Sequence, residues 1–391
     1  MPADPVSGLL DGVTVLDLAS VGPAARASGW LADYGAGVVK VGPLETNPDV
    51  QLTPPPHAYS GGRGTRRIRL DLKSDAGREV FLRLAEQADV VIESFRPGVV
   101  ARLGIGYDDV KSRNPRIVYC STSGYGQDGP KSQWAGHDLN YLAVGGYLAN
   151  TEPGADGKPP VPGATVADSA AGGMQAVIAI LAALVARGST GEGRFLDVAV
   201  ADGVLALMAL QVDDYLVTGT EPTPGTAPLS HRFACYDTYR AGDGGWLAVA
   251  AIEPKFWSNL CRLVDRPDLI ALQYDETAQD TVRASLSEVF ATKPRDEWVA
   301  LLAAADTCVS PVIDVAAATR DEHFTARRIT AEAHHPAAGT IHQLAPLLAG
   351  AVRGSSYELP DPTVTATADV LAGCGYTDEE IATLRERGAV Q

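Results

Sequence analysis

The sequence has few cysteines, few basic residues and no long apolar run. Its five cysteines form no CxxC pair, so neither a disulfide framework nor a zinc site is predicted. Lys and Arg number 32 against 48 Asp and Glu, and the formal net charge of −16 excludes nucleic acid and anionic membrane surfaces as main partners. The longest apolar run, Ala176–Ala186, is shorter than the roughly 20 residues of a membrane span, and we interpret it as a buried helix. Because the N-terminus also lacks the features of a signal peptide, we expect a cytoplasmic protein without membrane insertion.

The first 120 residues alternate apolar, strand-like runs with helix-like segments. The runs 13–18, 38–41, 89–93 and 117–121 read as strands, and 75–88 reads as a helix. Such alternation is typical of βαβ units, so we predict an α/β fold with a parallel, doubly wound sheet. Helical stretches are expected at about 169–187 and 196–217.

A Pro/Gly/Thr-rich segment, Glu221–Ser230, is predicted to be a linker to a second domain of mixed α+β structure. Residues 336–362 are again rich in proline. The tail that follows is predicted to contain a helix with Thr377 as its N-cap and an end at Gly388. We therefore predict a large domain over 1–220, the linker and small domain over 221–330, and a return segment with a C-terminal helix of the large domain over 331–391.

Two familiar motifs are excluded by their context. Gly124–Gly129 fits GxGxxG, but Pro130 and a polar run follow where a nucleotide-binding helix would begin, so we interpret this segment as a loop. His334, His335 and His342 lack a helical metal spacing and are interpreted as surface residues, and we predict no metal site.

A basic cluster interrupts the acidic chain at Gly62–Lys73. It could bind phosphate, which suits the planar guanidinium group of arginine, or it could be a solvated edge strand protected by charge. The sequence favours neither interpretation. The basic residues of the cluster are Arg63, Arg66, Arg67, Arg69 and Lys73.

Three residues are candidates for chemistry. Asp168 directly precedes a helix of small residues, where it could cap the helix and still carry a proton. His137 lies beside Asp138, and Glu253 ends an apolar strand before Pro254. Each of the three has an ordinary structural explanation when it is taken alone.

Together these segments resemble the alpha-methylacyl-CoA racemases of the class III CoA-transferase (CaiB/BaiF) superfamily. The resemblance runs in family order from about residue 8 to 315. It implies a Rossmann-like large domain, a smaller domain and an interlocked homodimer whose active sites use both chains. It rests on LADYGAGVVKV, RLDLKSDAG, ESFRPGVVARLGIG, NPRIVYCSTSGYGQDGP, AGHDLNYLAVGG, VADSAAGG, YDTYRAGDGGWLAVAAIEPKFW and DTCVSPV.

The resemblance also implies the site. The catalytic histidine and aspartate of the family fall on His137 and Asp168, and the glutamate that orients the histidine falls on Glu253. No cofactor is implied beyond the coenzyme A moiety of an acyl-CoA thioester substrate. The implied coenzyme A contacts are Leu70, Asp71, Leu72, Lys73, Ser94, Phe95, Arg96, Arg102, Gly136, His137, Asp138, Leu139, Asn140 and Tyr141.

The resemblance predicts an acyl-CoA racemase that inverts the alpha carbon of a 2-methylacyl-CoA thioester by 1,1-proton transfer through an enolate. The CoA transferases of the superfamily share the aspartate and usually lack the AGHD histidine and the AIEP glutamate, whereas this chain has all three. An alternative is a class III CoA-transferase that moves CoA between carboxylic acids through an aspartyl anhydride at Asp168. A third hypothesis, an inactive acyl-CoA-binding protein, is less favoured because the three reactive positions occur together.

Overall fold

The computed structural model describes residues 8–44, 55, 57–227, 229–361 and 363–391. These residues form two compact units. Unit 1 comprises the described residues of Met1–Gly145, Pro162–Leu207 and Glu322–Gln391, and unit 2 comprises those of Gly146–Val161 and Met208–Asp321.

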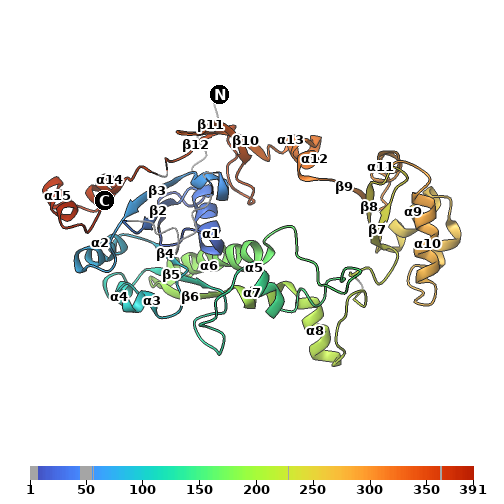
Figure 1. The fold of residues 1–391 in the computed structure, drawn as a ribbon, viewed down its shortest axis with the longest axis horizontal. Coiled ribbons are helices and arrows are strands. Elements are labelled where there is room, and N and C mark those ends of the chain that lie inside the picture. Colours follow the sequence, from blue (N-terminus) through green and yellow to red (C-terminus); the bar gives the residue numbers. More distant parts are fainter. Residues whose placement is uncertain (1–7, 45–54, 56, 228, 362) are drawn as a thin grey trace. The chain divides into compact units, whose positions relative to one another are not determined.

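Unit 1 is built on a six-stranded sheet in the order β3-β2-β1-β4-β5-β6, and every strand is parallel to its neighbours (Figure 1). This is the strand order of doubly wound nucleotide-binding sheets, in which ligands bind beyond the carboxyl ends of the strands at the switch point between β1 and β4. The α/β sheet predicted from the alternation is therefore confirmed. Its strands are β1 (Thr14–Asp17), β2 (Gly37–Gly42), β3 (Thr65–Arg69), β4 (Val90–Glu93), β5 (Val118–Ser123) and β6 (Arg194–Ala199).

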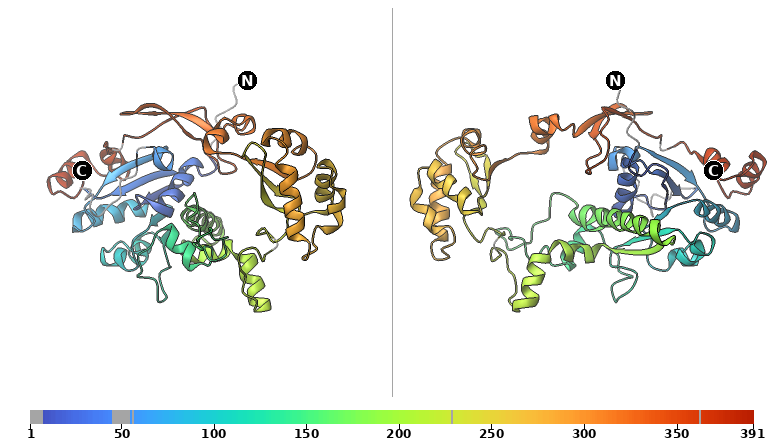
Figure 2. Two further views of the ribbon diagram at one scale, coloured as in Figure 1. Left: turned by 45° about the vertical axis from the view of Figure 1, so that its right-hand side comes forward. Right: turned by 180° about the vertical axis from the view of Figure 1, so that it is seen from behind.

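Side chains of successive strand residues pack on opposite faces of this sheet. Val90 and Ile92 join a core beneath α1 and α6, whereas Val91 joins the core beneath α2 and α4. The helices on both sides can be followed in Figure 2. Burial on both faces explains why the central strands are continuously apolar.

The helices of unit 1 follow the strands in sequence. A long helical stretch begins as a π-helix, η2, and continues as α6. The helical elements are α1 (Gly22–Asp33), η1 (Ala58–Gly62), α2 (Asp75–Glu86), α3 (Val99–Arg102), α4 (Tyr107–Arg113), α5 (Asp138–Val144), η2 (Ala167–Met174), α6 (Gln175–Thr190), α7 (Val200–Leu207), α13 (Glu322–Ala326), α14 (Thr367–Gly373) and α15 (Asp378–Glu386).

The C-terminal part of unit 1 adds a second sheet. In it β10 (Thr330–His335) pairs antiparallel with β11 (Gly339–Leu344) and parallel with β12 (Ser356–Glu358). Arg63 ties this part to the large sheet, because it forms an ion pair with Asp33 at 2.7 Å and also donates to the carbonyl of Leu344. The buried Arg63 of the basic cluster is thus structural.

Unit 2 contains an antiparallel sheet in the order β7-β8-β9 with helices around its own core. The largest buried side chains of this core are Trp257 and Trp298, each of which donates its indole N–H to a backbone carbonyl. The elements are α8 (Ala209–Thr218), β7 (Tyr236–Arg240), β8 (Trp246–Ala250), α9 (Pro254–Leu263), η3 (Pro267–Leu272), α10 (Gln279–Phe290), α11 (Arg295–Leu302), β9 (Val309–Val312) and α12 (Val315–Arg320).

Local sequence signals set several helix ends. Ser74 caps α2 by accepting the N–H of Gly77 at 3.0 Å. The predicted cap of the C-terminal helix is confirmed, since Thr377 and Glu380 form a reciprocal capping box at the start of α15. The loop interpretation of Gly124–Gly129 is also confirmed, because α5 begins only at Asp138.

Two expectations were wrong. Residues 196–199, which were expected to be helical, belong to strand β6, because this strand pairs in register with β5 and passes into α7 without a loop. His335 is buried, and its Nδ1 accepts the N–H groups of Ala337 and Ala338 in the β10–β11 turn. The compact units divide the chain differently from the predicted domains: unit 2 begins at Met208, ends at Asp321 and includes 146–161.

The apolar run at Ala176–Ala186 is part of a helix that extends over Ala167–Thr190, 24 residues, which is long and apolar enough to span a bilayer by length and composition. One such helix is weak evidence, because core helices of soluble proteins pass the same test. Of its most apolar window 39% is buried. Ala176, Val177 and Ile180 pack into the core, whereas Ile178 and Val185 are 68% and 78% exposed. The expectation of a buried helix therefore holds for one face only.

Candidate functional site

His137 immediately precedes α5 in extended backbone conformation. Its backbone N–H donates to Oδ1 of Asn140 at 3.0 Å, and its carbonyl accepts the N–H of Asn140 at 2.8 Å. The first turn of α5 therefore fixes the backbone of His137, because both the side chain and the backbone of Asn140 bond to it. The imidazole of His137 is exposed and is not used to cap the helix.

Asp168 is the second residue of η2, and its backbone N–H donates to Oδ1 of Asp138 at 2.9 Å. This hydrogen bond joins the start of η2 to the start of α5, which brings the neighbourhoods of Asp168 and His137 together. The expectation that Asp168 is the N-cap was wrong by two positions, because the helix begins at Ala167 after Val166. The N–H groups of Asp168 and Ser169 are both bonded within the protein, so neither is a free oxyanion donor.

The pKa of Asp168 is raised above its ordinary value. Partial burial is the main cause, and the neighbouring carboxylate of Asp138 acts in the same direction, whereas Arg26 and His137 lower it. His137 and Asp168 are thus close enough to interact electrostatically. A carboxyl group with a raised pKa can give and take protons nearer neutral pH than an exposed aspartate can.

Arg26 of α1 belongs to this site and was not predicted from the sequence. Its guanidinium donates to Oγ1 of Thr165 at 2.7 Å, just before η2, and lies 5.0 Å from the ring centroid of Tyr59. The Nε atom of Arg26 is buried and has no partner among the described residues. The signal available in the sequence was a single arginine in the small-residue helix GPAARASGW.

Glycines let three helices meet at Asp168. A Cβ atom on Gly173 would lie 2.8 Å from the Trp30 ring and 3.3 Å from Cβ of Arg26, and one on Gly203 would lie 2.1 Å from the carbonyl oxygen of Ala171. No side chain fits at these distances. The small residues of VADSAAGG are therefore required for η2 to pack between α1 and α7.

Tyr141 supports the segment that leads to His137. Its hydroxyl donates to the carbonyl of Gly136 at 2.5 Å, and its ring lies directly over Gly124 and Gly136, where any Cβ would clash with it. Burial, with a smaller contribution from Asp168, raises the pKa of Tyr141 to about 12, so the hydroxyl stays protonated at neutral pH. Tyr141 is buried, which leaves little of its side chain accessible to coenzyme A. Its contact with coenzyme A stays a prediction.

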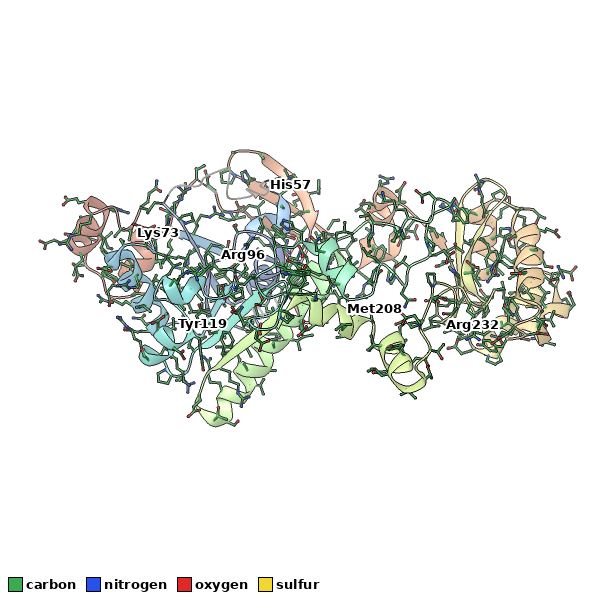
Figure 3. All side chains as sticks on the ribbon, turned by 60° about the horizontal axis from the view of Figure 1, so that its bottom comes forward. His57, Lys73, Arg96, Tyr119, Met208 and Arg232 are labelled. Atoms are coloured by element: carbon green, nitrogen blue, oxygen red, sulfur yellow. The ribbon has the colours of Figure 1, made fainter. Side chains whose placement is uncertain are left out.

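The other residues implied as coenzyme A contacts follow the carboxyl ends of β3 and β4 or lie on α3. Lys73, Ser94, Arg96 and Arg102 are exposed, and Figure 3 labels Lys73 and Arg96 on unit 1. Leu70 is buried, and Leu72 packs against the same core. Leu70 is 1% exposed and its N–H already bonds to Gly42, so it offers a ligand almost no accessible surface, whereas Leu72 is half-buried.

Glu253 lies in unit 2, where it is exposed and precedes α9, with Pro254 as the first helical residue. Strand β8 ends at Ala250, so Glu253 follows a strand, as the sequence indicated. Its pairing with His137 of unit 1 stays a prediction. Among the described residues no group of three or more His, Cys, Asp or Glu side chains could hold a metal ion.

Comparisons with known proteins place the chain in a family. Residues 10–366 match CoA-transferase family III, and the chain therefore belongs to that family. It is 33% identical to the human alpha-methylacyl-CoA racemase, over 95% of each chain, and 35% identical to a probable fatty acyl-CoA transferase of Mycobacterium tuberculosis, over 78% of this chain and 82% of the relative.

Solved structures agree with this assignment. A CaiB/BaiF family protein from Brucella suis has a TM-score of 0.75 at 28% identity and covers 94% of this chain and 100% of its own. Racemases and CoA transferases are both among the relatives at similar identity, so membership of the family leaves the reaction open.

Proposed function

We propose that the protein is an acyl-CoA racemase that inverts the alpha carbon of a 2-methylacyl-CoA thioester. The observation that carries this proposal is that His137 and Asp168 are close enough to interact electrostatically. Two different proton carriers stand at the starts of α5 and η2, and the bond from the Asp168 N–H to Asp138 links these two helix starts. Inversion requires one such group on each face of the carbon.

In the proposed reaction Asp168 takes the alpha proton of one enantiomer, and the C–H electron pair moves into the thioester to form an enolate. Protonated His137 then gives its proton to the opposite face of the carbon. The other enantiomer reacts with the two roles exchanged, so atoms and charge balance over the cycle. The raised pKa of Asp168 lets it take and give a proton nearer neutral pH, which suits a group that acts as base for one enantiomer and as acid for the other.

The alternative is a family III CoA-transferase. The carboxylate of Asp168 attacks the thioester to form an acyl anhydride and CoA thiolate, and the thiolate attacks the Asp168 carbonyl to form an aspartyl-CoA thioester with release of the first carboxylate. A second carboxylate attacks that thioester, and the displaced thiolate attacks the new acyl carbon, which forms the new acyl-CoA and frees Asp168. This reaction moves CoA between carboxylic acids. It is favoured by similarity to transferases such as the acetyl-CoA:oxalate CoA-transferase of Acetobacter aceti, 31% identical over 84% of this chain and 86% of the relative. It assigns His137 no essential role.

Deuterium exchange separates the two reactions. An enantiopure 2-methylacyl-CoA incubated with the racemase in D₂O, without an acceptor acid, should gain deuterium at the alpha carbon and racemise. Asp168→Asn and His137→Gln should each abolish inversion, because neither amide can carry the proton. Each variant should retain exchange for one enantiomer only, and the favoured enantiomer should differ between them.

Asp156→Asn, at an exposed position in unit 2, serves as the matched control and should behave as the unmodified protein. The racemase proposal fails where the unmodified protein incorporates no deuterium but yields an Asp168 acyl-enzyme that hydroxylamine traps. Activity that His137→Gln leaves intact would also contradict it.

Other residues would bind the substrate and complete the site. Exposed Lys73, Arg96 and Arg102 would bind the phosphates of coenzyme A, and no further cofactor would be needed. Glu253 would orient His137 in an interlocked homodimer with shared active sites. The free thiols and acidic surface suit a cytoplasmic enzyme that does not insert into membranes.

A further inference from the structure

Glu93 is a buried carboxyl group at a position where the fold binds ligands. It is the last residue of β4, a strand at the switch point of the sheet, and is 1% exposed. The proposed chemistry does not use it. The residues that follow it, Ser94–Arg96, are predicted coenzyme A contacts. If Glu93 positions them, it should change the affinity for coenzyme A.

Hydrogen bonds connect Glu93 to two loops. Its Oε2 accepts the backbone N–H of Phe95 at 2.7 Å, which fixes the turn after β4. Its Oε1 accepts the hydroxyl of Ser121, the residue paired with it on β5. Ser121 in turn accepts the side-chain amide of Gln127 at 3.1 Å, and Gln127 lies in the loop that precedes His137.

The same loop is held from the next strand. Asp197 of β6 accepts the backbone N–H of Gln127 at 2.9 Å. Gly126 has a left-handed φ of 85°, and a Cβ there would lie 3.4 Å from Ala199 and 3.5 Å from Asp197, so glycine suits this turn. Glu93, Ser121 and Asp197 thus stand side by side on β4, β5 and β6 and position the loop through Gln127.

Glu93 has no ion-pair partner among the described residues, and the charged group that acts on its pKa, Asp197, is an acid. Burial raises the pKa of Glu93 to about 7, Asp197 acts in the same direction, and the N–H of Phe95 opposes them. Tyr119 and Cys120 of β5 both interact electrostatically with Glu93. Burial raises the pKa of the Tyr119 phenol and of the Cys120 thiol, so both stay protonated near neutral pH. Asp17 of β1, which is paired with Lys40, acts on Cys120.

The hydrogen-bond pattern fits the ionised carboxylate. As a carboxylate, Glu93 accepts from both Phe95 and Ser121, while Ser121 accepts from Gln127. A proton on Oε2 would oppose the N–H of Phe95. A proton on Oε1 would have to be donated to Ser121, whose own hydrogen would then have no acceptor in the network. Protonation therefore either opposes the N–H of Phe95 or leaves the hydroxyl hydrogen of Ser121 without an acceptor, and both outcomes weaken the network.

We propose that Glu93 is a positioning residue whose carboxylate holds the Ser94–Arg96 turn and, through Ser121 and Gln127, the Gly124–Pro130 loop in the arrangement that binds the coenzyme A part of the substrate. The proposal rests on the proposed function for the identity of the ligand. It assigns Glu93 no contact with the reacting atoms. The KM for acyl-CoA should therefore respond to Glu93, and kcat should not.

The test compares the unmodified protein with Glu93→Gln. Calorimetry with CoA itself and steady-state kinetics with acyl-CoA are measured from about pH 5.5 to 8.5. Above pH 7 the variant should bind CoA about tenfold more weakly and show a matching rise in KM, the effect of about 1.4 kcal/mol, with kcat within about twofold. Below pH 7 the two proteins should converge, because glutamine resembles the protonated acid. The phosphates of CoA titrate in the same range, so the ratio between the two proteins is the informative quantity.

Glu192→Gln, at an exposed position after α6, is the matched control and should bind CoA as the unmodified protein does at every pH. Ser121→Ala removes the hydroxyl between Glu93 and Gln127 without changing a charge, and it should weaken CoA binding in the same pH range. If Glu93→Gln does not fold, the Ser121→Ala variant provides the test. A constant ratio between Glu93→Gln and the unmodified protein across pH, or a loss confined to kcat, overturns the positioning role. An unmodified protein that binds no CoA overturns the proposed function as well, whereas CoA binding without racemisation leaves the positioning role standing.

Discussion

The charged groups around Asp168 shift its pKa in opposite directions. Burial and Asp138 raise its pKa, while Arg26 and His137 lower it. Arg26 donates to Thr165 three residues before Asp168 and so also anchors the start of η2. It therefore controls both the position and the protonation of the proposed base.

Arg26→Gln should raise the pKa of Asp168 further, because it removes a cation that stabilises the carboxylate. For the enantiomer that Asp168 deprotonates, the acidic limb of the pH–rate profile should move to higher pH. The measurement is alpha-deuterium exchange against pH with each enantiomer.

Arg26→Lys is the control that keeps the positive charge, and its acidic limb should stay near that of the unmodified protein. An acidic limb at the same pH in Arg26→Gln, with measurable activity, would show that Arg26 does not govern Asp168.

At the scale of elements, close helix packing determines where Asp168 stands. The π-helix η2 lies against α1 and α7, and glycines stand at the points of closest approach. Packing of this density tolerates no added volume at the contact. The position of the proposed base Asp168 is thus set by glycines at the contacts of η2 with α1 and α7.

Gly203→Ala should destabilise the protein by about 1–3 kcal/mol and displace η2, because the new Cβ would lie 2.1 Å from the carbonyl of Ala171. Activity should fall with stability, since Asp168 lies on η2. Gly188→Ala, on the open face of α6 with nothing within 4 Å, is the matched control and should stabilise by about 0.5–1 kcal/mol. Urea unfolding of the two variants measures the difference, and equal stability of both would contradict the packing argument.

Strand β6 shows why local pattern was insufficient for this part of the fold. The segment 194–199 runs into α7 at Val200 without a turn residue, so helical and strand patterns overlap in any window that covers both. Pairing with β5 makes this segment a strand, because its six residues pair with six residues of β5 at the edge of the sheet. The sequence alone contains no signal of that pairing partner.

At the scale of the whole molecule, the proposed site takes His137 and Asp168 from unit 1 and Glu253 from unit 2. A homodimer with shared sites would combine Glu253 of one chain with His137 of its partner. Inactive His137→Ala and Glu253→Ala proteins, refolded together in equal amounts, should then regain activity. Since half of the dimers would be mixed and one of their two sites intact, recovery should reach about a quarter of the unmodified activity.

Both substituted side chains are exposed, so each variant should fold. Chromatography of the two proteins with different tags verifies the mixed dimers. Mixed dimers without activity would contradict a site shared in this way.

The sequence by itself determined the parallel α/β architecture and the capped C-terminal helix, and its resemblance to a known family proposed the pair His137 and Asp168. Each depends on short-range patterns: apolar runs between helices, a motif of a few residues, or Thr377 three residues before Glu380. The same patterns located the basic cluster but left its role open. The buried ion pair of Arg63 with Asp33 decided that role for one member.

Only the tertiary structure brought Arg26 to Asp168, Glu93 to Ser121 and Gln127, and His335 into the β10–β11 turn. These contacts join residues on different strands and helices, and no periodicity in the sequence records which surfaces will meet. The pKa of Glu93 depends on the same contacts, because burial between neighbouring strands, rather than the residue type, raises it to about 7. Residue types and their spacing therefore predicted the chemistry available to this protein, and packing decided which groups share one environment.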